Sequence, residues 1–200
     1  MPAASLPIDG RVARSYRTRE AVVDALLDLI NEGDLQPTAA RIAARASVSL
    51  RLVFHHFNDL ETIYAALAKR QFERVAPLLK PAVSSSLPLA SRIGEFVAQR
   101  ARMFEFITPV RRSALLREPF TPSLAKRLAA ARALARRQIQ ATFEPELAAC
   151  EGAEHRELLH ALDVALSWDA WDKMRRQQGL GESEARRVME RIARALLKHS

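Results

Sequence analysis

The chain has 200 residues, of which 31 are Lys or Arg and 23 are Asp or Glu, giving a formal net charge of +8 at pH 7. It is 48% hydrophobic but only 6% aromatic and has six glycines, which favours an all-α protein over a β-sandwich or a glycine-rich parallel sheet. No apolar run approaches the ~18 residues of a membrane span, no signal peptide opens the chain, and one cysteine excludes an intrachain disulfide framework. We therefore expect a cytoplasmic protein that binds no membrane.

The first predicted helix lies between Thr18, a candidate N-cap, and Gly33, a candidate for the left-handed residue that ends a helix. Apolar residues between them recur at i, i+4, i+7 and i+8, the spacing of one face of an amphipathic helix. These residues are Val22, Leu26, Leu29 and Ile30. We expect residues 1–15 to form a flexible N-terminal arm.

Residues 38–57 have the pattern of a helix-turn-helix, with short helices predicted over 38–46 and 50–57. The motif requires a small residue where its helices touch and a tight turn about four residues later, and Ala43 and Ser47 occupy those positions. Ser49 can cap the second helix, whose outer face would then be available to a major groove. That face comprises Leu50, Arg51, Leu52 and His55. A plain helical hairpin satisfies the same pattern, so the pattern alone leaves both interpretations open.

A further helix is predicted to begin after Asp59 and to continue towards Leu79. A stretch rich in Pro and Ser follows, and we place the boundary there between an N-terminal domain over 16–80 and a second domain over 81–200. Proline and glycine positions divide the second domain into five predicted helices. These cover 89–107, 110–118, 123–149, 155–178 and 183–198.

Several elements of the N-terminal region occur together, without gaps, in the spacing of a known family. They are the helix ending at Gly33, then Thr38, Ile42-Ala43, Ala46-Ser47-Val48-Ser49, Val53-Phe54-His55-His56-Phe57, Glu61 and Ile63. Through them, residues 16–66 resemble the DNA-binding domain of the tetracycline-repressor (TetR) family of bacterial transcription regulators. The resemblance implies an all-α fold in which a three-helix helix-turn-helix DNA-binding domain precedes a C-terminal helical bundle for ligand binding and dimerisation.

The resemblance also implies roles for individual residues. Leu50, Arg51 and Leu52 lie where the family reads bases, and the Arg51 guanidinium is the group that can contact a guanine edge in bidentate fashion. The positions that usually touch the DNA backbone or flank those contacts are Thr38, Ser49, Phe54, His55 and His56. For His56, a packed histidine without a DNA contact is the alternative.

Three positions depart from the family pattern. Ser47 stands where the family usually has Gly, Phe54 where it has Tyr and Leu60 where it has Lys. The last two replacements remove groups that commonly reach a phosphate, so we expect weaker non-specific DNA binding. An arginine-rich segment before the first helix either compensates as a DNA-contacting arm or is a solvated leader. Its arginines are Arg11, Arg14, Arg17 and Arg19.

The second domain is expected to bind a small organic effector and to dimerise. Large apolar residues are the candidates for a pocket, with ordinary core packing as the alternative for each. They are Met103, Phe104, Phe106, Phe120, Phe143, Trp168 and Trp171. Residues 101–140 carry a net charge of +7, which suits an anionic ligand or a set of solvated helix faces. The candidates for the dimer interface are Leu158, Leu162, Val188, Ile192 and Leu196.

The sequence contains no motif of an enzyme or of a metal site. His55 and His56 are adjacent and His155 and His160 are five apart, so neither pair has the i, i+4 spacing of a helical zinc site, and we expect no cofactor. The predicted function is a transcriptional regulator, by family default a repressor, that binds a palindromic operator as a homodimer and is released by a small molecule. The alternative is a helical ligand-binding or interaction protein whose helix-turn-helix no longer reads DNA.

Overall fold

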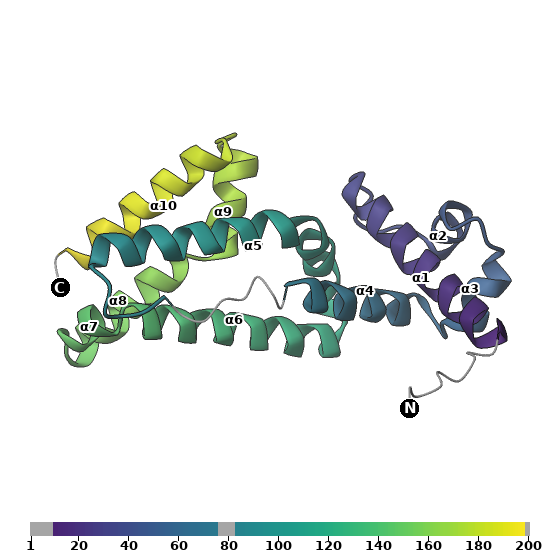
Figure 1. The fold of residues 1–200 in the computed structure, drawn as a ribbon, viewed down its shortest axis with the longest axis horizontal. Helices are drawn as coiled ribbons and strands as arrows, with labels where there is room; N and C mark the ends of the chain where they lie inside the picture. The colour runs from purple at the N-terminus through teal and green to yellow at the C-terminus, as the bar shows by residue number, and fades with distance from the viewer. Residues whose placement is uncertain (1–9, 76–82, 199–200) are drawn as a thin grey trace, which may run out of the picture. The chain divides into compact units, whose positions relative to one another are not determined.

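A computed structural model describes residues 10–75 and 83–198, and within these ranges the chain forms α-helices and no strand, which confirms the all-α prediction. The first four helices are α1 (Gly10–Asn31), α2 (Ala39–Arg45), α3 (Leu50–His56) and α4 (Leu60–Val75). They are followed by α5 (Leu89–Arg117), α6 (Pro122–Thr142), α7 (Glu144–Ala148), α8 (Gly152–Ala165), α9 (Trp168–Asp172) and α10 (Glu182–Leu197), as Figure 1 shows. Over the described ranges, no helix is long and apolar enough to cross a membrane.

The chain divides into two compact units. Of the described residues, the first unit contains 10–74 together with Pro109–Leu116, and the second contains Val75, 83–108 and 117–198. Helix α5 therefore contributes to both, which the proline spacing did not predict. The proposed linker falls partly at 76–82, outside the described residues.

The start predicted for α1 is wrong. The helix begins at Gly10, so residues 10–15 are helical, and Thr18 is an internal residue whose hydroxyl donates to the Arg14 carbonyl at 3.1 Å. The arginine-rich segment thus lies inside the helix. The other end is confirmed: Gly33 has φ +96°, and the N–H groups of Gly33 and Asp34 bond to the carbonyls of Ile30 and Leu29, both at 3.0 Å. A left-handed glycine with this pair of bonds closes the last turn of a helix.

The core of the first unit lies where α1 to α4 meet. Leu26, Ile42, Val53, Ile63 and Leu67 have no exposed surface there. The other residues of the face predicted for α1, Val22, Leu29 and Ile30, are at most 4% exposed, which confirms that face. Part of α5 adds to this unit, because the Ser113 hydroxyl donates to the Leu35 carbonyl at 2.7 Å.

Helix α5 continues through Pro109, where the sequence predicted a break. A proline inside a helix removes one backbone hydrogen bond and crowds the preceding turn. Buried residues lie on both sides of it, Phe104 at 3% exposure and Ser113 at 1%, so packing along the whole helix offsets that cost.

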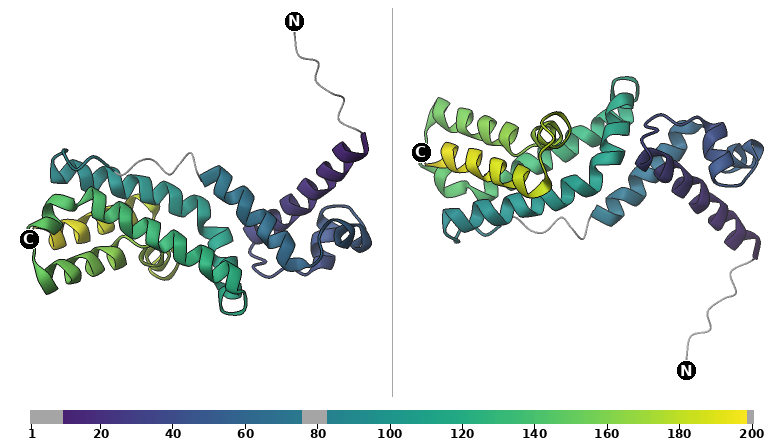
Figure 2. Two further views of the ribbon diagram at one scale, coloured as in Figure 1. Left: turned by 90° about the horizontal axis from the view of Figure 1, so that it is seen from below. Right: turned by 90° about the horizontal axis from the view of Figure 1, so that it is seen from above.

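The second unit has shorter helices than the sequence predicted. The 123–149 helix is divided after Thr142, and Pro145 lies in the first turn of α7. The 155–178 helix is divided by Ser167, which caps α9 by accepting the Ala170 N–H at 3.0 Å, and a five-residue π-helical turn over Lys173–Gln177 follows. Helix α10, yellow in Figure 2, packs against α8.

Candidate functional site

Two hydroxyl groups hold the helix-turn-helix in shape. Thr38 caps α2 by accepting the Arg41 N–H at 3.3 Å, and Ser49 caps α3 by accepting the Leu52 N–H at 3.1 Å. Capping uses an oxygen lone pair, so each hydroxyl keeps its own O–H as a donor. Both side chains are exposed at the start of their helices, where that donor can reach an acceptor outside the chain.

The turn between the two helices contains a strained backbone position. Ser47 has φ +55°, in the left-handed region that a side chain disfavours. The conformation is held by two bonds, from the Ser47 N–H to the Ala44 carbonyl at 3.1 Å and from the Val48 N–H to the Ala43 carbonyl at 3.0 Å. The geometry explains why glycine is the usual residue at this place in the family that the motif resembles.

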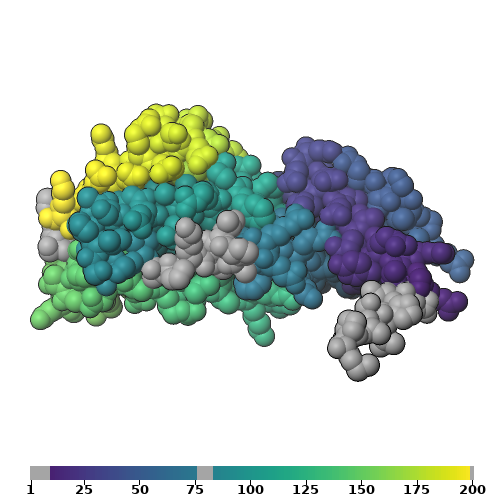
Figure 3. All heavy atoms as spheres, in the orientation of Figure 1, coloured from purple at the N-terminus to yellow at the C-terminus, as the bar shows by residue number. Residues whose placement is uncertain are grey.

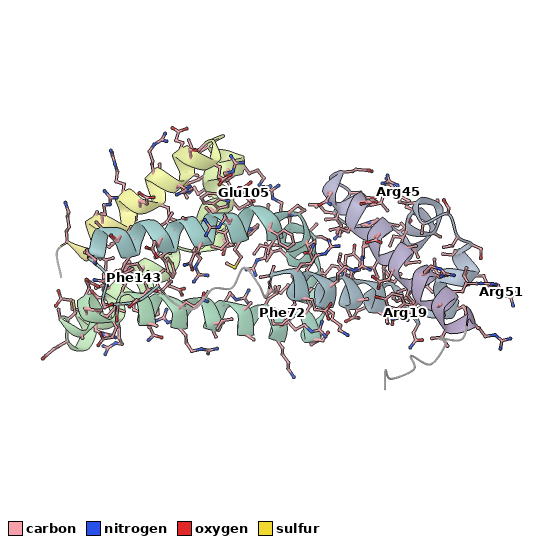
Figure 4. The ribbon with its side chains drawn as sticks, viewed as in Figure 1. Arg19, Arg45, Arg51, Phe72, Glu105 and Phe143 are labelled. Atoms are coloured by element: carbon pink, nitrogen blue, oxygen red, sulfur yellow. The ribbon has the colours of Figure 1, made fainter. Side chains whose placement is uncertain are left out.

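Helix α3 has one buried face and one exposed face. Val53 and the residue just after the helix, Phe57, lie in the core with 0% and 1% exposure. The outward residues are Leu50 at 43%, Arg51, Phe54 at 46% and His55, whereas Leu52 and His56 are half-buried. Arg51 extends from the end of the first unit in Figure 4.

The side chain of Arg51 differs from the two arginines of α2 in its ion pairing. Arg41 pairs with Asp34 at 2.9 Å, and Arg45 binds both carboxylate oxygens of Glu32 at 2.7 and 2.5 Å. Within the described part of the chain, the Arg51 side chain forms no ion pair or hydrogen bond. Arg51 can therefore bind an external group without first breaking a contact, whereas Arg41 and Arg45 would have to leave their carboxylates.

His56 lies beneath this surface. Burial, the charge of His55 and the charge of Arg19 all lower the pKa of His56, in that order of size. This shift disfavours the charged imidazole in the protein without a bound ligand. Its half-buried position agrees with the packing alternative.

Arg19 has a structural place in the first unit, which is neither of the two alternatives predicted for the arginine-rich segment, a DNA-contacting arm or a solvated leader. From within α1, it donates to the His56 carbonyl at the end of α3, and its guanidinium lies 4.3 Å from the centre of the Phe57 ring. A cation at the C-terminal end of a helix is stabilising. Sequence reasoning missed this role because the two residues are far apart in the chain. Arg14 and Arg17 are exposed on the same helix, purple in Figure 3.

The start of α4 is closed by its own cap. Asp59 Oδ1 accepts both the N–H and the hydroxyl of Thr62 at 2.7 Å. An N-terminal carboxylate satisfies the helix but repels an approaching phosphate. Leu60, where the family has Lys, packs against the core of the first unit.

The structure does not bring the predicted pocket residues into one site. Phe104 and Trp171 pack with ring centres 6.2 Å apart, and the nearby Trp168 indole donates to Thr108 Oγ1 at 2.9 Å. Phe143 instead packs on Phe96 at 5.5 Å, at the junction of α6 and α7. Figure 4 shows Phe143 well away from Glu105, which accepts the Trp171 indole N–H at 2.8 Å.

Three other pocket candidates lie at or near the surface. Phe120 is 85% exposed and Phe106 is 37% exposed, so neither is part of an interior site in this chain, and Met103 is half-buried. The sequence could not show which of these large apolar residues are buried, because the burial of each depends on the helix that packs against it. Phe104, Trp168 and Trp171 remain together.

The predicted dimer residues also separate into two groups. Leu158 and Leu162 are 9% and 0% exposed, so they pack in the subunit's own core and offer little surface to a partner. On α10 the buried residues are Ala185, Met189, Ala193 and Leu197. The interface candidates on α10 lie beside that face, since Val188 and Leu196 are half-buried and Ile192 is 39% exposed. On α8, Val164 is 71% exposed.

No protein-family model matches the chain, and no curated protein matches its sequence. Solved structures do match. A transcriptional regulator from Rhodococcus sp. Rha1 aligns with a TM-score of 0.67 and 17% identity, over 90% of this chain and 96% of that one. A TetR-family transcriptional regulator from Streptomyces coelicolor aligns with a TM-score of 0.60 and 18% identity, over 89% of this chain and 80% of that one. A TetR-like transcriptional regulator from Rhodococcus sp. RHA1 aligns with a TM-score of 0.58 and 17% identity, over 96% of this chain and 98% of that one. The fold is thus that of TetR-family regulators, as the N-terminal motif predicted.

Proposed function

We propose that this chain, with its TetR-type fold, is a DNA-binding transcriptional regulator that reads an operator with the outer face of α3. The observation that carries the proposal is the uncommitted, exposed Arg51 on a short helix whose opposite face is anchored in the core. An α-helix fits the major groove, and a guanidinium can donate two hydrogen bonds to one guanine edge. Leu50 and Phe54 beside it supply apolar surface for thymine methyl groups.

We infer that the operator is an inverted repeat bound by a homodimer. One helix-turn-helix makes too few contacts for specific binding, whereas two related by a two-fold axis can enter successive major grooves about 34 Å apart. A small organic effector would then act by favouring a conformation in which this spacing is wrong. Coupling of this kind is typically worth about 1–3 kcal/mol.

The test is a selection of random DNA duplexes with the purified protein. The expected result is an inverted repeat with a guanine at the position of Arg51 in each half-site, and a loss of that guanine preference with Arg51→Ala. Arg41→Ala is the matched control, because Arg41 is a nearby arginine held in an ion pair. Recovery of unrelated duplexes bound with equal affinity would overturn the proposal.

The second candidate is a helical ligand-binding or interaction protein whose helix-turn-helix has lost specific DNA reading. It is favoured by the positions where groups that could bind a phosphate are missing or weakened. Phe54 lacks a hydroxyl, Leu60 packs against the core, Asp59 caps the start of α4, and burial lowers the pKa of His56. The same selection separates the two candidates, since this one predicts no enriched sequence.

A further inference from the structure

The second unit contains two buried arginines on α5 that differ in their surroundings. Arg92 and Arg100 are each only 4% exposed. The Arg92 guanidinium binds both carboxylate oxygens of Glu146, at 2.6 and 2.5 Å, and donates to the carbonyls of Leu87 and Thr142, each at 2.9 Å. A buried guanidinium is well accommodated when a carboxylate and carbonyls take up its donors in this way.

Arg100 has no such carboxylate. Its Nη2 donates to the Ala135 carbonyl at 2.9 Å, and its guanidinium lies 4.7 Å from the centre of the Phe96 ring. Asp163 on α8 acts on Arg100 only through space, because its Oδ2 accepts a bond from Arg136 at 3.2 Å. Across the described ranges, Arg100 forms no ion pair.

The charge of Arg100 persists despite its burial. Burial lowers the pKa of Arg100 to about 10, and the charge of Asp163 opposes this shift. The guanidinium is therefore still protonated at pH 7. A buried charge without a direct counterion is strongly destabilising, and residues with this property concentrate at binding and catalytic sites.

The neighbours of Arg100 define what could neutralise it. Along the same face of α5 lie Phe96, Val97 and Phe104, all at most 3% exposed. An anion that binds Arg100 would have to fit among these apolar side chains, which favours one with an apolar body. A carboxylate matches the planar guanidinium in a bidentate arrangement, as Glu146 does at Arg92.

We propose that Arg100 is the anion-binding residue of an effector site in the second unit, and that its ligand is an organic monocarboxylate with an apolar body. The assignment of this ligand as an effector rests on the proposed regulatory function. A phosphate dianion fits less well, because one guanidinium neutralises one charge and the neighbouring Arg136 is already paired with Asp163.

The first experiment compares acids with matched uncharged molecules on the full chain. Thermal shift and calorimetry are measured with sodium octanoate and benzoate, and with 1-octanol and benzyl alcohol. The two carboxylates should bind and raise the melting temperature, and each alcohol should bind at least tenfold more weakly. Equal binding of acid and alcohol, or no binding of either acid, would overturn the proposal without the need for any variant.

The second experiment identifies the residue. Arg100→Met should lower octanoate affinity at least tenfold, whereas Arg102→Met, at an exposed position on the same helix, should leave it unchanged. Without ligand, Arg100→Met should raise the melting temperature, because it removes an unpaired buried charge, and Arg92→Met should lower it, because it strands Glu146. If Arg100→Met does not fold, Arg100→Gln, which also removes the charge, replaces it; unchanged octanoate affinity in the folded variant contradicts the assignment.

A third measurement separates this inference from the proposed function. Octanoate should release the selected duplex from the unchanged protein and from Arg102→Met, but not from Arg100→Met. Arg100-dependent binding without release would keep the carboxylate site and overturn its role as the effector site. Failure to select any duplex would overturn the DNA-binding function and leave the calorimetric result standing by itself.

Discussion

Arg51 is the residue on which specific recognition should depend most. Its substitution by Ala removes the one guanidinium on α3 that can form a bidentate contact with guanine. We expect Arg51→Ala to weaken binding to the best operator by roughly 1–3 kcal/mol and to remove base preference at one position in each half-site. The measurement is a titration of the operator and of operators substituted at single positions.

The pattern of loss distinguishes two roles of Arg51. Uniform weakening across all sequences would show that Arg51 binds a phosphate. Arg41→Ala provides the comparison, since this arginine is paired with Asp34 and should leave base preference intact.

Ser47 and Ser49 should respond to substitution in opposite directions. Ser47 occupies the left-handed region at φ +55°, so Ser47→Gly should stabilise the first unit by about 1 kcal/mol. Ser49 caps α3, so Ser49→Ala should destabilise it by about 1 kcal/mol. Urea unfolding of the two variants measures both changes. Loss of stability in Ser47→Gly would mean that the serine side chain contributes more than the backbone conformation costs.

At the scale of the element, the start of α4 determines how strongly the first unit binds DNA of any sequence. Leu60→Lys adds one positive charge per subunit beside the Asp59 cap. We expect tighter binding to all duplexes. The slope of the logarithm of the binding constant against the logarithm of the salt concentration should become steeper by roughly one to two, because one or two further phosphates are contacted per dimer. Titrations at several salt concentrations test this.

Leu60→Met is the matched control for α4, because it keeps the apolar packing without the charge. If Leu60→Lys and Leu60→Met show the same salt slope, the start of α4 does not approach the DNA backbone.

At the scale of the whole molecule, the prediction concerns the dimer. Ile192 and Val164 are exposed apolar residues on α10 and α8, two helices that pack against each other. A glutamate at either position should therefore disfavour a buried interface without disturbing the subunit core. We expect Ile192→Glu and Val164→Glu to be monomeric with unchanged helix content and to lose high-affinity operator binding. Sedimentation and circular dichroism measure these properties.

Two controls define the limits of the dimer test. Arg191→Ala changes an exposed residue next to Ile192 and should leave the protein dimeric. A normal dimer from both glutamate variants would place the interface elsewhere on the chain.

Features that depend on neighbouring residues could be predicted from the amino-acid sequence. The end of α1 at Gly33 and the cap at Ser49 were predictable, because a cap or a turn acts on backbone groups within a few residues. Apolar residues at helical spacing also identified the core side of α1.

Features that depend on residues far apart in the chain became known only from the packing of the helices. Helical spacing shows that Leu162 and Ile192 lie on apolar faces, but not that one is covered by its own subunit and the other is exposed. In the same way, Arg19 reaches the end of α3 and Arg92 reaches Glu146 across long sequence separations, whereas Arg100 meets no carboxylate. The physical reason is that burial and ion pairing are set by the neighbouring helix, whose placement no local pattern encodes.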